Sequence, residues 1–469
     1  MNFTALAFVA GFPLVLLAHT LCPPGGRWAL LLAASLAFYA LGSPQALPLL
    51  AAITLGTYAA ARGIDRSRTE AGKNLWCAGA LMLCLGCLGW FKYAGFFAET
   101  FAAVRGGTTA VRSVLLPAGI SFYTFQTLGY VLDVRRGTVQ PEKHLGYYAL
   151  FVCFFPQLVA GPIERTAVLL PQLRDGARRP DARGTVLLLR GFAKKLLLAD
   201  AIAPFVDAVY AAPGQGTGAE MLAATVLFAG QIYFDFSGYS DIAVGAAALL
   251  GVKLSRNFDH PYAACSIREF WRRWHISLTR WFTDYLYIPL GGSRCGALRH
   301  GVNLMLVFLV SGLWHGAAWH FVLWGALHGL FLVAENGIRR RFPDRQLPRP
   351  AARLLTLALV CFAWVFFRAG SIPEGMQLLA QLPVGWSFAA VADCLRALGG
   401  TTLAQLALGG LCLALLPERG SWDGSRTLAL FWLTVATVTA WGMGLTAGAG
   451  NAFLSLIHIS EPTRHLRIS

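Results

Sequence analysis

The sequence predicts an all-α polytopic membrane protein, and three observations lead to this prediction: its composition, its long apolar segments and the clustering of its basic residues. Of the 469 residues, 56% are hydrophobic and 13% are charged, whereas soluble globular chains are about 45–50% apolar and about 25% charged. This composition argues strongly against a soluble enzyme, a disordered chain and a coiled coil.

Apolar segments with lengths near the roughly 20 residues that cross a bilayer recur along the chain. They lie near residues 3–21, 28–42, 45–61, 75–97, 114–132, 146–160, 185–207, 219–250, 301–335, 352–368, 402–417 and 427–447. Because some are short and others are long enough for two helices, we expect about eleven transmembrane helices. The short segment 146–160 ends at Gly161-Pro162, which favours a re-entrant segment whose broken backbone is covered by protein or water.

The net charge of +16 is concentrated in three connections between apolar segments. Residues 164–195 and 253–299 each hold eight basic and three acidic residues, and residues 339–353 hold six and one, so each connection carries +5. The tendency of basic residues to lie in cytoplasmic loops explains this placement, whereas nucleic-acid-binding proteins carry them on a soluble face. We therefore expect a multi-pass membrane protein with no nucleic-acid partner.

The first set of polar residues at membrane depth lies in the middle of the apolar segment 219–250. Gln231, Asp235, Ser237, Tyr239 and Asp241 place hydrogen-bonding groups around much of one helix, so this helix cannot face lipid on all sides. The set fits either a polar brace to neighbouring helices or the lining of a substrate cavity, and the sequence favours neither.

The second set, in residues 311–329, holds three histidines and three tryptophans: His315, His320, His328, Trp314, Trp319 and Trp324. Two glycine pairs spaced four apart, Gly312 with Gly316 and Gly325 with Gly329, predict close helix packing. Since His315 and His328 each precede the second glycine of a pair, we expect both beside a neighbouring backbone, either as satisfied core residues or as functional groups. Their spacing matches no zinc site, so we expect no bound metal.

Between these sets, residues 269–289 carry an aromatic face. Trp271, Trp274, Leu278, Trp281 and Tyr285 recur at spacings of three and four, which predicts one amphipathic helix with arginines on another face. Such a helix suits the membrane interface. This interpretation does not explain His275 in the middle of the helix.

Together with other motifs, these residues resemble the membrane-bound O-acyltransferase family, and within it the bacterial branch that includes the alginate O-acetylation membrane protein. The resembling blocks lie at residues 91–93, 117–126, 154–163, 231–241, 257–292, 313–316 and 364–368. The block rich in arginine and tryptophan and the Trp-His-Gly motif are highly specific together. Thr279, Thr283 and Ser293 depart from the family pattern without touching the expected chemistry.

The resemblance implies a single membrane domain over residues 1–453, with its core at 90–370, in which helices surround a tunnel. It implies that His315 of the Trp-His-Gly motif is catalytic and that His275 is the second conserved polar position. Further candidates for the tunnel lining are Gln157, Gln231, Asp235, Tyr239, Asp241, Trp314 and His328. Since a histidine in a dry tunnel stays largely neutral, we expect His315 to act as general base and His275 to orient the donor or stabilise the oxyanion.

The implied function is that of an O-acyltransferase of the bacterial cytoplasmic (inner) membrane. It would move an acyl group, in the first instance acetyl, from a cytoplasmic thioester toward hydroxyls of an exported polysaccharide such as alginate. We expect no tightly bound cofactor; acetyl-CoA or another acyl thioester is a substrate, and the basic residues within 165–195 and 339–353 could attract it or an acidic carrier. The expected partners are the lipid bilayer, the acyl donor or carrier, and a periplasmic acetyltransferase or polysaccharide-export proteins.

Two alternatives remain open from the sequence. The same fold could transfer D-alanine to teichoic acid or an acyl group to peptidoglycan. A transporter or channel from a different class would depend chiefly on Asp235 or Asp241, whereas an acyltransferase would depend on His315.

The end of the chain breaks abruptly from the preceding composition. Residues 454–464 read Leu-Ser-Leu-Ile-His-Ile-Ser-Glu-Pro-Thr-Arg and resemble the translation of a transposase-based sequencing-library adapter. We therefore expect residues 454–469 to be a non-native tail, and we assign no function to His458 or His465.

Overall fold

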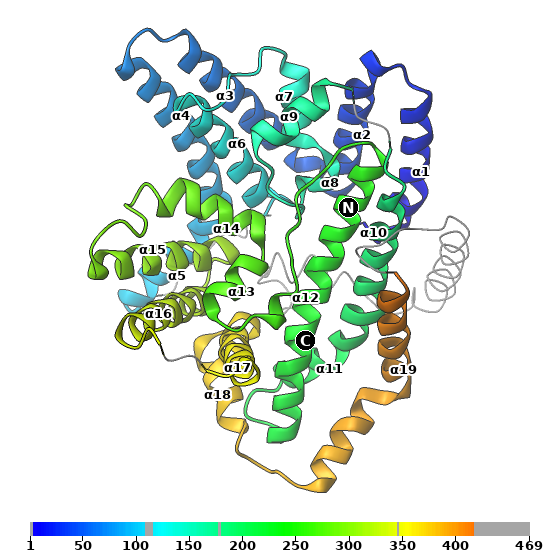
Figure 1. Ribbon diagram of the computed structural model, residues 1–469, viewed down its shortest axis with the longest axis vertical. Helices are drawn as coiled ribbons and strands as arrows, with labels where there is room; N and C mark the ends of the chain where they lie inside the picture. The colour runs from blue at the N-terminus through cyan, green and yellow to red at the C-terminus, as the bar shows by residue number, and fades with distance from the viewer. Residues whose placement is uncertain (1–2, 108–115, 177–179, 345–346, 417–469) are drawn as a thin grey trace. The chain divides into compact units, whose positions relative to one another are not determined.

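The computed structural model describes residues 3–107, 116–176, 180–344 and 347–416, and in these ranges the chain is helical with no strand (Figure 1). The predicted all-α fold class is confirmed. The chain clusters into two compact units. The first comprises Met1–Leu188 and Ser240–Arg256, and the second comprises Leu189–Tyr239 and the described residues from Asn257 onward.

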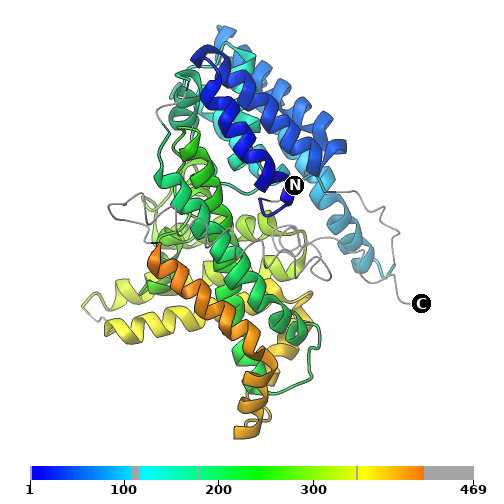
Figure 2. The ribbon, with the colours of Figure 1, turned by 90° about the vertical axis from the view of Figure 1, so that its right-hand side faces the viewer.

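The helices fall into two groups along the chain. Those that begin in the first unit are α1 (Leu6–Leu21), α2 (Arg27–Gly42), α3 (Leu47–Arg66), α4 (Glu70–Leu88), α5 (Ala94–Val104), α6 (Ile120–Arg135), α7 (Leu145–Cys153), α8 (Phe155–Leu158), α9 (Thr166–Arg174) and α10 (Arg183–Phe192). Those that begin in the second are α11 (Asp200–Tyr210), α12 (Gly218–Leu249), α13 (Ile267–Arg273), α14 (Ile276–Phe282), α15 (Ala297–His315), α16 (Trp319–Arg341), α17 (Arg349–Arg368), α18 (Ile372–Gln381) and α19 (Phe388–Leu415). Figure 2 shows α12 as one continuous helix and α19 as a bent one, and the bend lies at Gly399, whose φ of 74° and ψ of 152° are not helical.

Seven helical runs in the described part of the chain are long and apolar enough to cross a membrane. They are Pro24–Gly42, Pro44–Arg66, Glu70–Val104, Ala297–His315, Trp319–Arg341, Arg349–Arg368 and Phe388–Leu415. The total of about eleven spans stays a prediction. The expected span at 427–447 and the expected tail at 454–469 lie outside the described residues.

The first unit contains the short segment that we expected to dip into the membrane. The nine residues of α7 extend only about 14 Å at 1.5 Å per residue, which is too short to cross a bilayer core of roughly 30 Å. After α7 the chain breaks and continues as α8. The side-chain amides of Gln126 and Gln157 both donate to the carbonyl of Phe151, at 2.7 and 2.8 Å, so a carbonyl that has no partner within its helix is satisfied at the break.

The second unit contains the hairpin of α15 and α16, which lie side by side in Figure 1. A Cβ atom on Gly312 would collide with the carbonyl of Phe321, and one on Gly325 would collide with the carbonyl of Phe308. The close helix packing that the glycine spacing predicted is therefore confirmed. The adjoining core is aromatic, with Trp324 and Trp364 stacked at 5.7 Å between ring centroids.

The prediction of one amphipathic helix over 269–289 is wrong. The structure ends α13 at Arg273, places Trp274 in extended backbone and starts α14 at Ile276. Trp271 and Trp274 are buried in the core of the second unit. These two aromatic residues, which we expected on a face at the membrane interface, therefore pack against protein. The break occurs where His275 takes a left-handed backbone conformation.

Candidate active site

His315 is the last residue of α15, and the chain turns extended at Gly316 directly after it. Its ring lies edge-on to Trp324 of α16, with ring centroids 5.0 Å apart, and to Phe367 of α17 at 5.4 Å. Both neighbouring rings are buried, whereas His315 is partly exposed. Aromatic rings therefore orient this imidazole at a helix end and leave part of its surface accessible.

His275 lies between α13 and α14, outside the candidate membrane spans. Its side chain is only 1% exposed, and burial lowers the pKa of His275 to about 3, so its ring is neutral near pH 7. Its φ of 43° and ψ of 54° fall in the left-handed region, which costs a non-glycine residue roughly 1–3 kcal/mol. Such a conformation persists only where the surrounding structure enforces it.

Asn257 helps to hold the backbone of His275 in this conformation. Its backbone carbonyl accepts the N–H of Ile276 at 2.9 Å, and its side-chain oxygen accepts the hydroxyl of Ser277 at 2.6 Å. Both partners directly follow His275. The sequence did not single out Asn257 as a functional residue, and its only signal was its place at the start of a resembling block.

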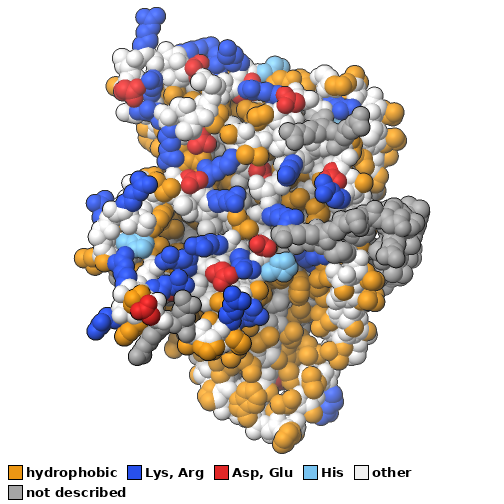
Figure 3. All heavy atoms as spheres, in the orientation of Figure 1, with side chains coloured by type: hydrophobic (Ala, Val, Ile, Leu, Met, Phe, Trp, Pro, Cys, Tyr) orange, Lys and Arg blue, Asp and Glu red, His pale blue; other side chains and the backbone are white. Residues whose placement is uncertain are grey.

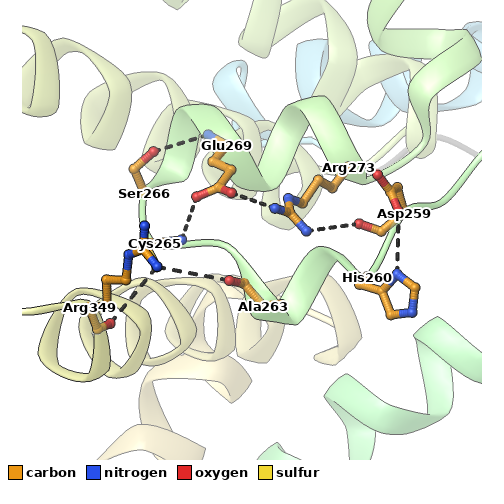
Figure 4. A network of polar contacts seen from close by, with 8 residues as sticks. All are labelled: Asp259, His260, Ala263, Cys265, Ser266, Glu269, Arg273 and Arg349. Atoms are coloured by element: carbon orange, nitrogen blue, oxygen red, sulfur yellow. Dashed lines mark hydrogen bonds and ion pairs between the residues drawn. The ribbon is translucent and has the colours of Figure 1, made fainter.

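A polar network holds the preceding helix α13 (Figure 4). Ser266 accepts the backbone N–H of Glu269 at 3.1 Å, and the Glu269 carboxylate accepts the N–H of Cys265 at 2.7 Å. Arg273 donates to the same carboxylate at 2.6 Å and to the backbone carbonyl of Asp259 at 3.4 Å. The Cys265 amide first, and Arg273 with it, holds the pKa of Glu269 below its usual range, so this carboxylate stays charged and fixes the helix that leads into His275.

The ring of Trp314 contacts the rings of both histidines. Its ring centroid is 5.9 Å from that of His275 and 4.9 Å from that of His315, and both pairs are edge-to-face. The structure thus brings His275, from the break between α13 and α14, to the tryptophan that directly precedes His315 on α15. His275 also packs edge-to-face against Phe236 of α12, with ring centroids 4.7 Å apart.

His328 lies deeper in the same aromatic cluster. It is fully buried, and its ring lies 5.0 Å from that of Trp324. The indole N–H of Trp271 donates to Nδ1 of His328 at 3.3 Å, which leaves the ring proton of a neutral imidazole on Nε2. Its enclosure by aromatic rings indicates a core residue that supports Trp324 behind His315.

The polar residues of α12 in the second unit have a clear structural partner. Asp235 forms an ion pair with Lys195 at 2.7 Å, and Lys195 also pairs with Asp200 at 2.7 Å. Asp235 and Lys195 are 2% and 6% exposed. Gln231 and Tyr239 are buried on the same helix. This arrangement favours the polar brace over the cavity lining at Asp235.

Lys195 and Asp200 were missed as candidate residues although the signal was present. Both lie within the apolar segment 185–207, where a charged side chain needs a partner of opposite charge. Lys195 lies in the π-helical turn Ala193–Ala199, and Asp200 is the first residue of α11. Irregular turns of this kind often mark sites where a helix adapts to a special contact.

The remaining two candidates belong to the first unit. Gln157 donates to the carbonyl of Phe151, which is a structural contact at the break after α7. Asp241 is half-buried on α12. The structure therefore groups His275, Trp314 and His315 at one place, with His328 behind them, and gives Gln157 and Asp235 bracing contacts.

These features define a class of protein: a helical membrane protein with several candidate spans, in which two histidines contact one tryptophan. The sequence profile of MBOAT, the membrane-bound O-acyltransferase family, matches residues 142–372, which include both histidines. The chain belongs to this family and is a membrane O-acyltransferase.

Three relatives show the range of the similarity. The protein named "Probable alginate O-acetylase AlgI" from Azotobacter vinelandii is 39% identical over 391 residues, which cover 81% of this chain and 78% of the relative. The peptidoglycan O-acetyltransferase of Helicobacter pylori is 36% identical over 381 residues, covering 74% and 72%. The teichoic acid D-alanyltransferase of Streptococcus thermophilus is 29% identical over 246 residues, covering 49% and 59%.

Proposed function

We propose that this chain moves an acetyl group from a cytoplasmic thioester across the membrane toward hydroxyl groups of an exported polysaccharide, with alginate as the final acceptor. The observation that carries the chemistry is the contact of both His275 and His315 with the ring of Trp314, at 5.9 and 4.9 Å between ring centroids. The similarity to a relative named as an alginate O-acetylase over 81% of this chain supports the acceptor.

His315 is the general base. Its imidazole accepts the proton of the acceptor hydroxyl while the oxygen attacks the thioester carbonyl carbon and forms the new C–O bond. When the tetrahedral intermediate collapses, the C–S bond breaks and the imidazolium returns the proton to the leaving thiolate. Because His315 ends α15, the partial negative charge at the carbonyl end of the helix stabilises the imidazolium.

His275 has the complementary role of a neutral donor. Its ring is buried and uncharged, and Asn257 fixes the backbone on its C-terminal side. A neutral imidazole carries one N–H group, and a fixed donor of this kind stabilises the negative charge that develops on the thioester oxygen. The acyl donor is acetyl-CoA or another acyl thioester, which binds as a substrate and not as a resident cofactor.

The proposed setting is the bacterial inner membrane. The acyl donor or its carrier approaches from the cytoplasm, where the basic connections lie by the positive-inside tendency. A periplasmic acetyltransferase or polysaccharide-export proteins receive the group on the other side. The match to a peptidoglycan O-acetyltransferase at 36% identity makes peptidoglycan the second candidate acceptor.

The test is the O-acetyl content of polymers from an alginate-producing strain that lacks its own transferase and expresses this chain. Wild type is expected to restore alginate O-acetyl groups, measured by NMR of the purified polymer, and His315→Ala is not. His260→Asn is the matched control, because His260 is exposed and its left-handed backbone tolerates asparagine. Acetylated peptidoglycan with unmodified alginate would move the assignment to the second acceptor, and incorporation of D-alanine would contradict both.

A further inference from the structure

A groove opens between α15 and α16 in the second unit, at the end of the hairpin opposite to His315. Its volume is about 400 Å³. Ala297, Gly301, Val333 and Gly337 line its length, and Arg340 and Arg341 lie at its end. A Cβ atom on Gly337 would meet nothing within 4 Å, and one on Gly301 would meet only Val333 at 3.8 Å, so the groove is open space along one flank of both helices.

The charged end of this groove lacks an acidic counterpart. Arg339 pairs with Glu335 at 3.1 Å, but neither Arg340 nor Arg341 forms an ion pair with a carboxylate among the residues that the structure describes. Arg340 instead donates to Nδ1 of the buried His300 at 3.2 Å, which fixes the guanidinium at the groove. Figure 3 shows blue side chains gathered over this part of the hairpin.

The surface around the groove is apolar. The two helices expose Leu298, Val302, Leu330 and Ile338, and both are candidate membrane spans. Such side chains face the hydrocarbon of a bilayer, whereas two arginines at a helix end that have no carboxylate partner among the described residues suit the headgroup layer. A ligand that fits the whole groove therefore has an apolar chain and an anionic head.

We propose that this groove binds one anionic phospholipid, with the headgroup phosphate on Arg340 and Arg341 and an acyl chain along Gly301, Val333 and Gly337. A free phosphate would leave the apolar length of the groove uncovered, and a zwitterionic lipid would leave the charge of the arginines uncompensated. Basic pockets between transmembrane helices on the cytoplasmic side bind headgroups in this way. The proposal depends on membrane insertion and not on the reaction at His315.

The test titrates the full-length protein in neutral detergent with phosphatidylglycerol, phosphatidylcholine or inorganic phosphate and follows the thermal unfolding midpoint. Phosphatidylglycerol is expected to raise the midpoint saturably, and phosphatidylcholine and phosphate are not. Arg340→Gln with Arg341→Gln should weaken the apparent affinity for phosphatidylglycerol roughly 30-fold, since each arginine near an anionic headgroup contributes about five-fold. The exposed pair Arg349→Gln with Arg353→Gln removes the same charge from the same basic stretch and should keep wild-type affinity.

A second variant tests the apolar part of the groove. Gly337→Leu places a side chain in the groove at a position where an added Cβ atom meets nothing within 4 Å. It should weaken phosphatidylglycerol binding while the midpoint without lipid stays near that of wild type. Gly79→Leu on α4 is its control, because Gly79 also has open space around it. Three results would overturn the proposal. They are an equal loss of phosphatidylglycerol affinity in the two double-arginine variants, an equal rise of the midpoint with phosphatidylglycerol and phosphatidylcholine, and the full rise of the midpoint with phosphate alone.

Discussion

The ion-pair group of Lys195, Asp200 and Asp235 gives a quantitative prediction about the membrane-embedded polar residues. Replacing Lys195 by methionine keeps the length of the side chain and removes the cation that pairs with both aspartates at 2.7 Å. Since Asp235 is 2% exposed, it cannot recover its solvation from water. Removing one partner of a buried ion pair typically costs about 3–5 kcal/mol, and here two carboxylates lose their partner.

The expected loss is observable as a thermal shift. With an unfolding entropy of about 2.1 cal/mol/K per residue, a chain of 469 residues loses about 1 °C per kcal/mol. Lys195→Met should therefore lower the apparent midpoint by about 3–5 °C. The assay is thermal unfolding of the purified protein in detergent. Lys253→Met is the matched control, because Lys253 is exposed, and its midpoint should stay within about 1 °C of wild type.

A neutral triple variant separates a structural role from ion transport. Lys195→Met with Asp200→Asn and Asp235→Asn removes every charge of the group, and replacing a whole buried ion-pair group is often close to neutral for stability. Its midpoint should recover relative to Lys195→Met, and acyl transfer should be retained. If Lys195→Met is as stable as Lys253→Met, or if the folded triple variant loses all acyl transfer, the assignment of these residues as a brace is refuted.

Three further predictions concern the histidine site and its support. Asn257→Ala should lower acyl transfer about two- to tenfold, because the loss of its side-chain acceptor for Ser277 weakens the fixation of His275 by roughly one hydrogen bond. Asn257→Asp, which keeps the acceptor, should recover most of the rate measured with labelled acetyl-CoA. The folded pKa of His275, about 3, lies below its unfolded value, so its contribution to stability is present above pH 6.5 and is lost as the pH falls below 6.5. Between pH 7 and 5 the free energy of unfolding of the wild type, measured by denaturant titration, should fall by about 2 kcal/mol more than that of His275→Asn. Parallel pH profiles of the two proteins would contradict this. Gly325→Ala should lower the free energy of unfolding by about 1–3 kcal/mol, because its Cβ would collide with the carbonyl of Phe308. Gly337→Ala should leave the free energy of unfolding unchanged. Equal thermal midpoints for the two variants would contradict the close packing.

Composition and spacing predicted much of the fold because they report directly on membrane burial. Long apolar segments marked the helices, and the glycine pairs around His315 and His328 correctly indicated close packing of α15 on α16. The break at His275 was not predicted. Aromatic residues at spacings of three and four look the same on one helix and on two short helices joined by a left-handed residue, since periodicity contains no information about a single backbone dihedral angle.

The residues of the candidate site were predicted from the sequence, because polar groups are costly to place in a membrane and therefore stand out in apolar segments. Their partners were not predicted, because they depend on tertiary contacts. Asp235 could line a cavity or form a brace until Lys195 was placed beside it. The contact of Trp314 with His275 could not be read from the sequence, because it depends on how the break between α13 and α14 packs against α15.

The most direct measurement of the central claim is the rate of acetyl transfer by the purified, reconstituted full-length protein with His315→Gln. Glutamine keeps a polar side chain at the end of α15 and cannot act as a base near pH 7. The rate is expected to fall about 10²–10⁴-fold, the usual contribution of general-base catalysis, with an unchanged thermal midpoint and with His260→Asn at the wild-type rate. A folded His315→Gln protein that transfers acetyl at the wild-type rate would contradict the assignment of His315 as the base.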